Sequence, residues 1–139
     1  MALTKYFVFL FFVCFPTIAS SQSIYDGSNL LIGKIEKDGI VRDRNNMTIG
    51  KFYSDGDVRD RNNMLAGKIE KNATIRNRNN MLVGKMEPDG IVRDRNNMMV
   101  GKVETGGIVR DRNNMTIGYA KDIPAAYVAV FFFFNMFER

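Results

Sequence analysis

The sequence contains no histidine and no tryptophan, and its single cysteine is Cys14. The lack of histidine excludes Ser-His-Asp and Cys-His nucleophile systems, and also histidine-ligated zinc or haem. One cysteine cannot form an internal disulfide, so a disulfide framework is excluded as well. The 139 residues, with a formal net charge of +5, have room for one small domain. We therefore expect no cofactor.

Residues 1–21 have the order of features found in a secretory signal peptide. Lys5 precedes an apolar run over residues 6–15, Pro16 interrupts any helix, and mostly small residues follow. This order predicts cleavage near Ser21 and export of residues 22–139 to the periplasm, the cell surface or the medium. Two alternatives are open. One is a membrane anchor, although the run is short of the roughly 20 residues that a spanning helix needs. The other is lipid modification of Cys14, which lacks the small preceding residues that such processing favours.

A 17-residue repeat fills the chain between this segment and the C-terminal tail. The phrase Val-Arg-Asp-Arg-Asn-Asn-Met begins at positions 41, 58, 92 and 109, and it recurs with two changes at 75. A degenerate copy begins at 24, so full units start at 24, 41, 58, 75 and 92 and a partial unit starts at 109. Seventeen residues are too few for a helical-hairpin repeat or a propeller blade. They suit two short strands and two turns.

Each unit carries two turn signals. Asp38-Gly39 and its counterparts in other units favour tight hairpin turns with positive φ. The third unit has Asn72-Ala73 instead, and an alanine at positive φ costs about 1 kcal/mol, which predicts the loosest turn. The second turn is Arg-Asn-Asn, as in residues 44–46. We expect Asp43 to accept backbone N–H bonds across this turn, and Asn77 to do the same in its unit.

Three apolar sites recur in each unit, with a glycine between the second and the third. These two sites are three residues apart, so a regular strand would place them on opposite faces. A bulge at the glycine can turn both inward. Each hairpin then buries about three side chains, so several hairpins must share one core. In order, the sites are Val41, Val58, Ile75, Val92 and Val109; Ile49, Ala66, Val83, Val100 and Ile117; and Phe52, Ile69, Met86 and Val103.

The C-terminal segment 123–137 is apolar on all sides and includes four consecutive phenylalanines. Such an element is either buried all round or in lipid. As a helix its 15 residues would span about 22 Å, which is short for a bilayer and suits an axial plug in a small ring of hairpins. A central strand, which aromatic residues favour, and a membrane tail are the alternatives.

The order of these features resembles the bacterial 5-fold β-flower proteins. The order begins with the predicted signal peptide and ends with an Ala- and Phe-rich tail. Between them lie tandem units, each made of apolar-Gly-Lys, an Asp-Gly turn, and Val-Arg-Asp followed by a polar turn. The resemblance covers essentially all of residues 22–139 as a single repeat domain. It implies a mainly β fold: a shallow, roughly five-fold symmetric barrel of hairpins, similar to the tubby C-terminal barrel, with a C-terminal apolar helix as axial plug. It implies no activity and no catalytic residues.

Positive charges recur at three positions of the unit. In a closed ring each position forms a circle of like charge, which could attract an anionic lipid or a polyanionic glycan. The alternative is pairing with the repeated acids, since Arg93, Arg95 and Lys102 face Asp94 and Glu104, a net charge of only +1. The candidate anion-binding residues are Arg42, Arg59, Arg76, Arg93 and Arg110.

Other functions find little support in the sequence. Residues 43–46 resemble the start of a calcium loop, but the closing position 12 holds Ser54 and not a carboxylate, so no metal site is predicted. The balanced charge and the lack of aromatic residues in the basic sites argue against nucleic acid. The carboxylates recur in equivalent settings, so no pair is set apart for acid–base catalysis. We expect a monomeric, secreted, non-enzymatic structural or binding module. The alternative is a tubby-like binder of anionic lipid or polyanion through a basic rim.

Overall fold

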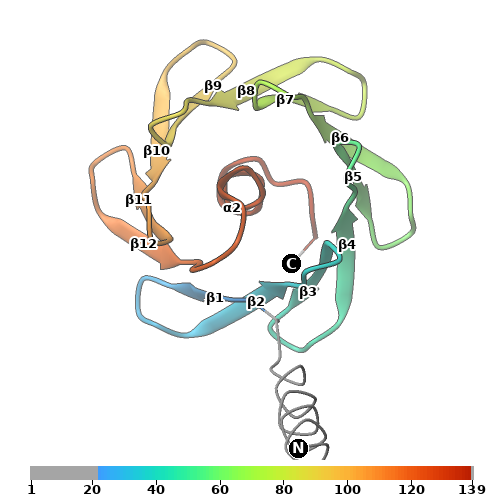
Figure 1. Ribbon diagram of the computed structural model, residues 1–139, viewed down its shortest axis with the longest axis horizontal. Coiled ribbons are helices and arrows are strands. Elements are labelled where there is room, and N and C mark those ends of the chain that lie inside the picture. The colour runs from blue at the N-terminus through green and yellow to red at the C-terminus, as the bar shows by residue number, and fades with distance from the viewer. Residues whose placement is uncertain (1–21, 139) are drawn as a thin grey trace, which may run out of the picture.

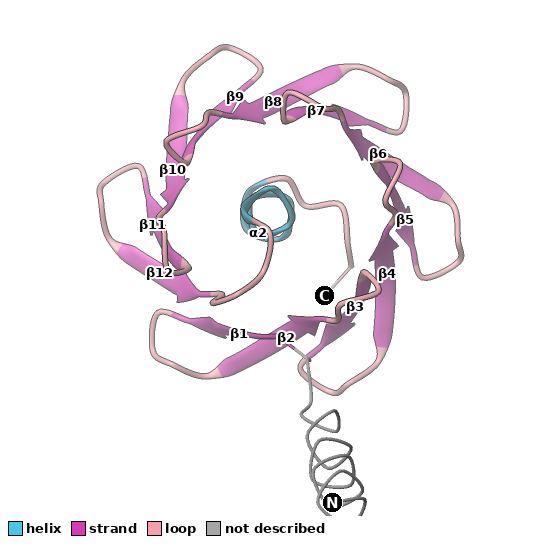
Figure 2. Cartoon of the chain, viewed as in Figure 1, coloured by secondary structure: helices cyan, strands magenta, loops and turns pink. Residues whose placement is uncertain are grey.

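The computed structural model describes residues 22–138, which form a closed ring of antiparallel strands around a helix (Figures 1 and 2). The segment for which we predict a signal peptide lies outside the described residues. Strands follow one another round the ring in chain order, and β1 closes on β12 with Tyr25 opposite Tyr119. Closure leaves no unpaired sheet edge, which is the site at which sheets otherwise aggregate.

Each hairpin consists of two short strands joined by the polar turn of the repeat. The degenerate first copy forms β1 and β2, and the sixth copy forms β11 and β12, so the ring has six hairpins. The predicted mainly β barrel of hairpins is confirmed, with six hairpins where the resemblance implied five. The strands are β1 Gln22–Asp26, β2 Leu31–Ile35, β3 Ile40–Asp43, β4 Thr48–Phe52, β5 Asp57–Asp60, β6 Leu65–Ile69, β7 Thr74–Asn77, β8 Leu82–Met86, β9 Ile91–Asp94, β10 Met99–Val103, β11 Ile108–Asp111 and β12 Thr116–Tyr119.

The turns within the hairpins, which we call the Asn-Asn turns, are held by their first side chain. They cover residues 26–30, 43–47, 60–64, 77–81, 94–98 and 111–115. Asp43 Oδ1 accepts hydrogen bonds from the N–H groups of Asn45 at 2.9 Å and Met47 at 3.0 Å. The amide oxygen of Asn77 makes the two equivalent bonds in its own turn. The predicted role of both residues is confirmed.

The connections between hairpins, which we call the Asp-Gly turns, have a residue at positive φ where the sequence indicated one. They cover residues 36–39, 53–56, 70–73, 87–90 and 104–107. Gly39 has a φ of +96° and donates its N–H to the Glu36 carbonyl at 2.8 Å. Ala73 has a φ of +63°, so the third turn places a Cβ in the left-handed region.

A bulge in every hairpin turns two apolar sites toward the core. Val41 pairs with Gly50 while Arg42 pairs with Thr48, which leaves Ile49 as an extra residue. The same register shift occurs in the other five hairpins. Val41, Ile49 and Phe52 are all buried, so the predicted bulge is confirmed. Burial is less complete in some other units, where Val83 and Met86 are half-buried.

The helix α2, Ala125–Phe133, occupies the centre of the ring (Figure 1). Of the three alternatives for the C-terminal segment, the buried helix is the one observed. It ends earlier than residue 137, and the chain then turns from the axis toward the wall (Figure 2). Phe52 on β4 contacts both the helix and the chain after it. Its ring stacks on Tyr127 of the helix at 4.1 Å between centroids and meets Phe137 edge-on at 5.4 Å. Within residues 22–138, no helical segment combines the length and apolar character that crossing a membrane requires.

The glycines of the six bulges each face one large side chain of the C-terminal segment. Successive residues of that segment meet successive hairpins in the direction β2, β12, β10, β8, β6 and β4, and only Asn135 is skipped. The helix and the chain after it therefore follow the ring at about one residue per hairpin. The facing pairs are Gly33 with Phe131, Gly118 with Phe132, Gly101 with Phe133, Gly84 with Phe134, Gly67 with Met136, and Gly50 with Phe137.

Candidate functional site

The arginines for which the sequence suggested anion binding lie on the outer wall of the ring, each beside a carboxylate. Arg42 follows the buried Val41 on β3 and so points outward. Its Nε lies 3.0 Å from Glu36 Oε2, and its Nη1 donates to the Asn46 carbonyl at 3.3 Å. The guanidinium of Arg42 therefore connects an Asp-Gly turn with an Asn-Asn turn, and those of Arg76, Arg93 and Arg110 do the same. The other pairs are Arg59 with Asp57 at 3.3 Å, Arg76 with Glu70 at 3.3 Å, Arg93 with Glu87 at 3.2 Å and Arg110 with Glu104 at 3.1 Å.

Opposite each of these arginines the neighbouring strand carries a lysine. Lys34 pairs in register with Arg42, and the same arrangement recurs at the next four strand pairs. At the sixth pair, which closes the ring, Tyr25 and Tyr119 replace both cations. No lysine of this set has an ion pair within the described chain. These five lysines and five arginines, with their five paired carboxylates, together carry a net charge of +5.

A second set of arginines lies in the Asn-Asn turns. Arg44, Arg61, Arg78, Arg95 and Arg112 are exposed, and none of them forms an ion pair among residues 22–138. The sequence alone presents both sets as equivalent circles of charge. Strand parity distinguishes them, because an arginine that follows a buried valine must face outward, whereas one in a turn can reach the end of the ring.

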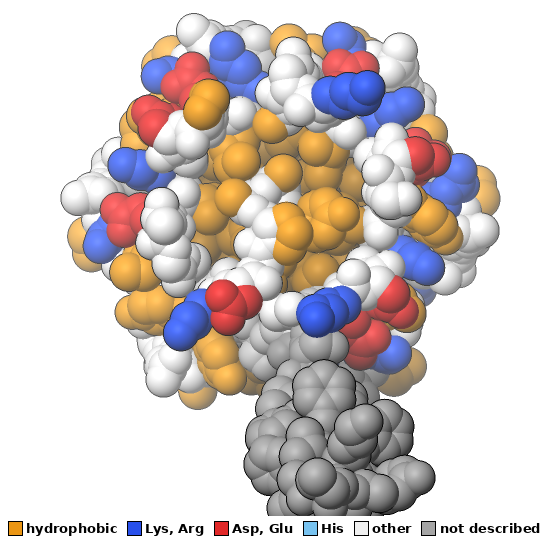
Figure 3. Space-filling model, viewed as in Figure 1, with side chains coloured by type: hydrophobic (Ala, Val, Ile, Leu, Met, Phe, Trp, Pro, Cys, Tyr) orange, Lys and Arg blue, Asp and Glu red, His pale blue; other side chains and the backbone are white. Residues whose placement is uncertain are grey.

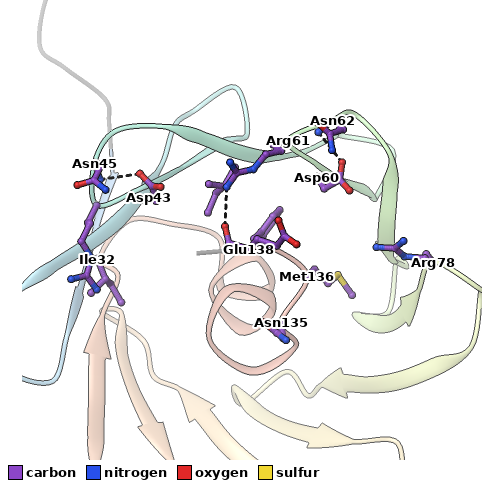
Figure 4. A pocket seen from close by; sticks show the side chains of 13 residues that line it. Ile32, Asp43, Asn45, Asp60, Arg61, Asn62, Arg78, Asn135, Met136 and Glu138 are labelled. Carbon is purple, nitrogen blue, oxygen red and sulfur yellow. Dashed lines mark hydrogen bonds between the residues drawn. The ribbon is translucent and has the colours of Figure 1, made fainter.

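Three of the turn arginines gather with the C-terminal segment around a depression of about 980 Å³ at the Asn-Asn end of the ring, which we call the mouth. Arg44, Arg61 and Arg78 stand on its wall, and Figure 4 shows Arg61 pointing toward Glu138, whose carbonyl it meets at 3.4 Å. The wall also holds Asp43, Asn45, Asp60 and Asn62, and the floor contains Ile32, Ile49, Met136 and Phe137. A smaller depression of about 310 Å³ beside it shares Arg78, Asn135 and Met136.

The carboxylates of the mouth are partly occupied by the fold. Asp60 Oδ1 accepts the N–H groups of Asn62 and Met64, as Asp43 does in the preceding turn. Of the three mouth arginines, Arg61 donates a hydrogen bond to a main-chain carbonyl, and the turns need none of the three guanidinium groups for their own backbone bonds. The mouth is thus an open, partly apolar hollow whose lining holds three arginines, none of them in an ion pair within residues 22–138, and the carboxylates of Asp43, Asp60 and Glu138. The space-filling view likewise shows, on the face that it presents, apolar side chains lining a central hollow with charged side chains around it (Figure 3).

Sequence reasoning missed the mouth because the C-terminal segment makes the ring unequal. The repeat treats all Asn-Asn turns alike, but residues 135–138 lie only against those of the second, third and fourth units. The skipped Asn135, with a φ of +46°, is where this segment departs from its regular path. Within residues 22–138 no group of three or more histidine, cysteine, aspartate or glutamate side chains is placed to hold a metal ion.

A closed ring of short hairpins, wound from one repeated unit around an apolar helix, defines a repeat barrel of the β-flower type. The chain belongs to the family described as 5-fold beta-flower protein, whose sequence model matches residues 21–136. No curated protein and no solved structure matches the chain.

Proposed function

We propose that the protein is an exported, non-enzymatic binding module whose mouth takes an anionic amphiphile, such as a lipid with a charged headgroup. The observation that carries this proposal is the gathering of Arg44, Arg61 and Arg78 over an apolar floor. Guanidinium groups bind phosphate and carboxylate oxygens through paired donors, and the floor can cover an apolar chain. An anion with an attached apolar part satisfies both surfaces at once.

Two further features support a binding role. The repeated aspartates serve the turns in the same way from unit to unit, so none is placed in a setting of its own as acid–base catalysis requires. The order of residues 1–21 supports export, which would bring the module to the periplasm, the cell surface or the medium, where anionic lipids are accessible.

Titration calorimetry with a water-soluble short-chain lipid tests the mouth. We expect the chain from Gln22 onward to bind dihexanoyl-phosphatidylglycerol and to bind dihexanoyl-phosphatidylcholine far more weakly. The double variant Arg61→Gln/Arg78→Gln should lose about tenfold or more in affinity, because a charged hydrogen bond contributes about 1.5–3 kcal/mol. The matched control is Arg95→Gln/Arg112→Gln, which changes equivalent turns outside the mouth. Equal affinity for the two lipids, or an equal loss in both variants, would contradict the proposal.

The outer wall favours a second candidate, which is a polyanionic glycan wound around the ring. Its basis is the five lysines that lie opposite arginines, since like charges in register cost stability and none of these lysines has an ion pair within the described residues. Binding to dextran sulfate, weakened by salt and by Lys68→Gln/Lys85→Gln but not by Arg61→Gln/Arg78→Gln, would favour this candidate over the mouth.

A further inference from the structure

Large apolar side chains are exposed almost exclusively at the Asn-Asn turns. Of the eleven large apolar residues exposed in the described chain, only Tyr119 lies elsewhere. Six occupy the last position of the turn and are 54% to 64% exposed: Leu30, Met47, Met64, Met81, Met98 and Met115. Four follow directly in the next strand and are 36% to 42% exposed: Leu31, Leu65, Leu82 and Met99. We call these ten residues the apolar crown.

The fold does not account for the crown. None of the ten residues belongs to the buried core or to the partly buried residues packed against it. The turn itself needs only the backbone of its last residue, since Asp43 accepts the N–H of Met47 and donates its own N–H to the Met47 carbonyl. A polar side chain would serve there equally well. Large apolar side chains exposed at every Asn-Asn turn of the ring therefore point to an interaction site at this end of the barrel.

Geometry and charge indicate what kind of partner fits. The six Asn-Asn turns of the closed antiparallel ring lie at one end of the barrel, so a flat surface such as a bilayer can touch all of them together. Five of the six turns also hold an exposed arginine without an ion pair in residues 22–138. Basic residues beside exposed apolar ones are typical of surfaces that enter the headgroup region of anionic membranes.

We propose that the apolar crown is the face with which the protein lies on an anionic lipid bilayer. The methionine and leucine side chains enter the boundary between headgroups and acyl chains, and Arg44, Arg61, Arg78, Arg95 and Arg112 meet the lipid phosphates. The aspartates of the same turns stay with the backbone N–H groups that they already accept. This proposal concerns the whole end of the ring and does not depend on ligand binding in the mouth.

The absence of tryptophan allows a direct test with single-tryptophan variants of the chain from Gln22 onward, which holds every strand of the ring. Met81→Trp places the reporter in the crown, and Lys85→Trp places a matched reporter on the outer wall, in the strand β8 that follows Met81. On vesicles of phosphatidylglycerol and phosphatidylcholine, emission of Met81→Trp should shift to the blue and be quenched by brominated acyl chains. Lys85→Trp should show neither change, and pure phosphatidylcholine should bind weakly.

A second variant separates insertion from simple charge attraction. Met64→Gln/Met81→Gln/Met98→Gln should reduce the fraction that sediments with anionic vesicles at least tenfold while the circular dichroism stays unchanged. Retained sedimentation, or equal quenching of the two tryptophan reporters, would overturn the proposal. So would a dimer, detected by sedimentation equilibrium without lipid, that the triple variant abolishes, because a second copy of the chain would then cover the crown. If the arginine variants of the mouth left short-chain lipid binding unchanged, the proposed function of the mouth would fail. The crown would still be tested by the tryptophan reporters and by the triple methionine variant.

Discussion

Gly101 on β10 lies directly against the ring of Phe133, and a methyl group on this glycine would overlap both the ring and the carbonyl oxygen of Arg110. The glycine therefore does two things in one place: it sits beside the bulge that turns Val100 inward, and it leaves room for a side chain of the plug. Its counterparts in the other five hairpins face plug side chains in the same way.

Replacing Gly101 with alanine should consequently destabilise the ring. Overpacking of a filled core costs about 1–3 kcal/mol, so the free energy of unfolding in urea should fall by that amount. Phe133→Leu shortens the facing side chain, and the double variant should lose less than the sum of the two single losses. Strict additivity would show that Gly101 and Phe133 act independently and would contradict this assignment.

The contact between Gly101 and Phe133 also shows which features of the fold the sequence predicts and which it does not. The 17-residue period predicts the strands, both turns, the three apolar sites and the bulge, because each depends on local spacing. It does not predict which plug side chain meets Gly101, since that match depends on the winding of a helix inside a closed ring. The number of hairpins depends on whether degenerate copies pair, as Tyr25 and Tyr119 do. The mouth could not be predicted from the repeat either, because it forms only where the fold brings Glu138 beside the Asn-Asn turns.

The Asp-Gly turn with alanine offers a stabilising change. Ala73 has a φ of +63°, a conformation that costs a residue with a Cβ about 1–2 kcal/mol and costs glycine almost nothing. Ala73→Gly should raise the free energy of unfolding by about 1 kcal/mol. Gly90→Ala, at a φ of +94° in the next turn, is the reverse change and should lower it. Hydrogen exchange should show residues 70–73 opening more easily than 87–90 in the natural protein, and equal protection would contradict this prediction.

The Asn-Asn turns require an acceptor but not a charge. Asp94 Oδ1 accepts two N–H groups, from Asn96 at 2.9 Å and from Met98 at 3.0 Å, and the amide oxygen of Asn77 makes the same pair of bonds. Asp94→Asn should therefore change the midpoint of thermal unfolding little. Asp94→Ala removes the oxygen that accepts both bonds and should cost about 1–3 kcal/mol. A loss in Asp94→Asn as large as that in Asp94→Ala would show that the carboxylate charge, and not the acceptor, stabilises the turn.

Removal of the C-terminal segment should unfold the ring. Each hairpin buries only a few side chains, and Val128, Ala129, Val130 and Phe131 fill the space that the hairpins enclose. Full burial of a phenylalanine contributes about 1.5–3 kcal/mol, and Phe131 is 1% exposed, whereas the total stability of a small domain is about 5–15 kcal/mol. A chain that ends at residue 124 would expose Val41, Val58, Ile75 and their counterparts to water on the inner wall.

We expect that truncated chain to aggregate or to lose its β-type circular dichroism, and to bind a dye for exposed apolar surface if it stays in solution. Phe131→Ala is the milder test, because it keeps the segment and leaves a cavity beside Gly33, which should cost about 3–5 kcal/mol. A soluble truncation with an unchanged spectrum and a cooperative thermal transition would show that the closed backbone ladder is sufficient. The ring would then be stable without the C-terminal segment. The six glycines that face this segment would need a different explanation from the space that they leave for its side chains.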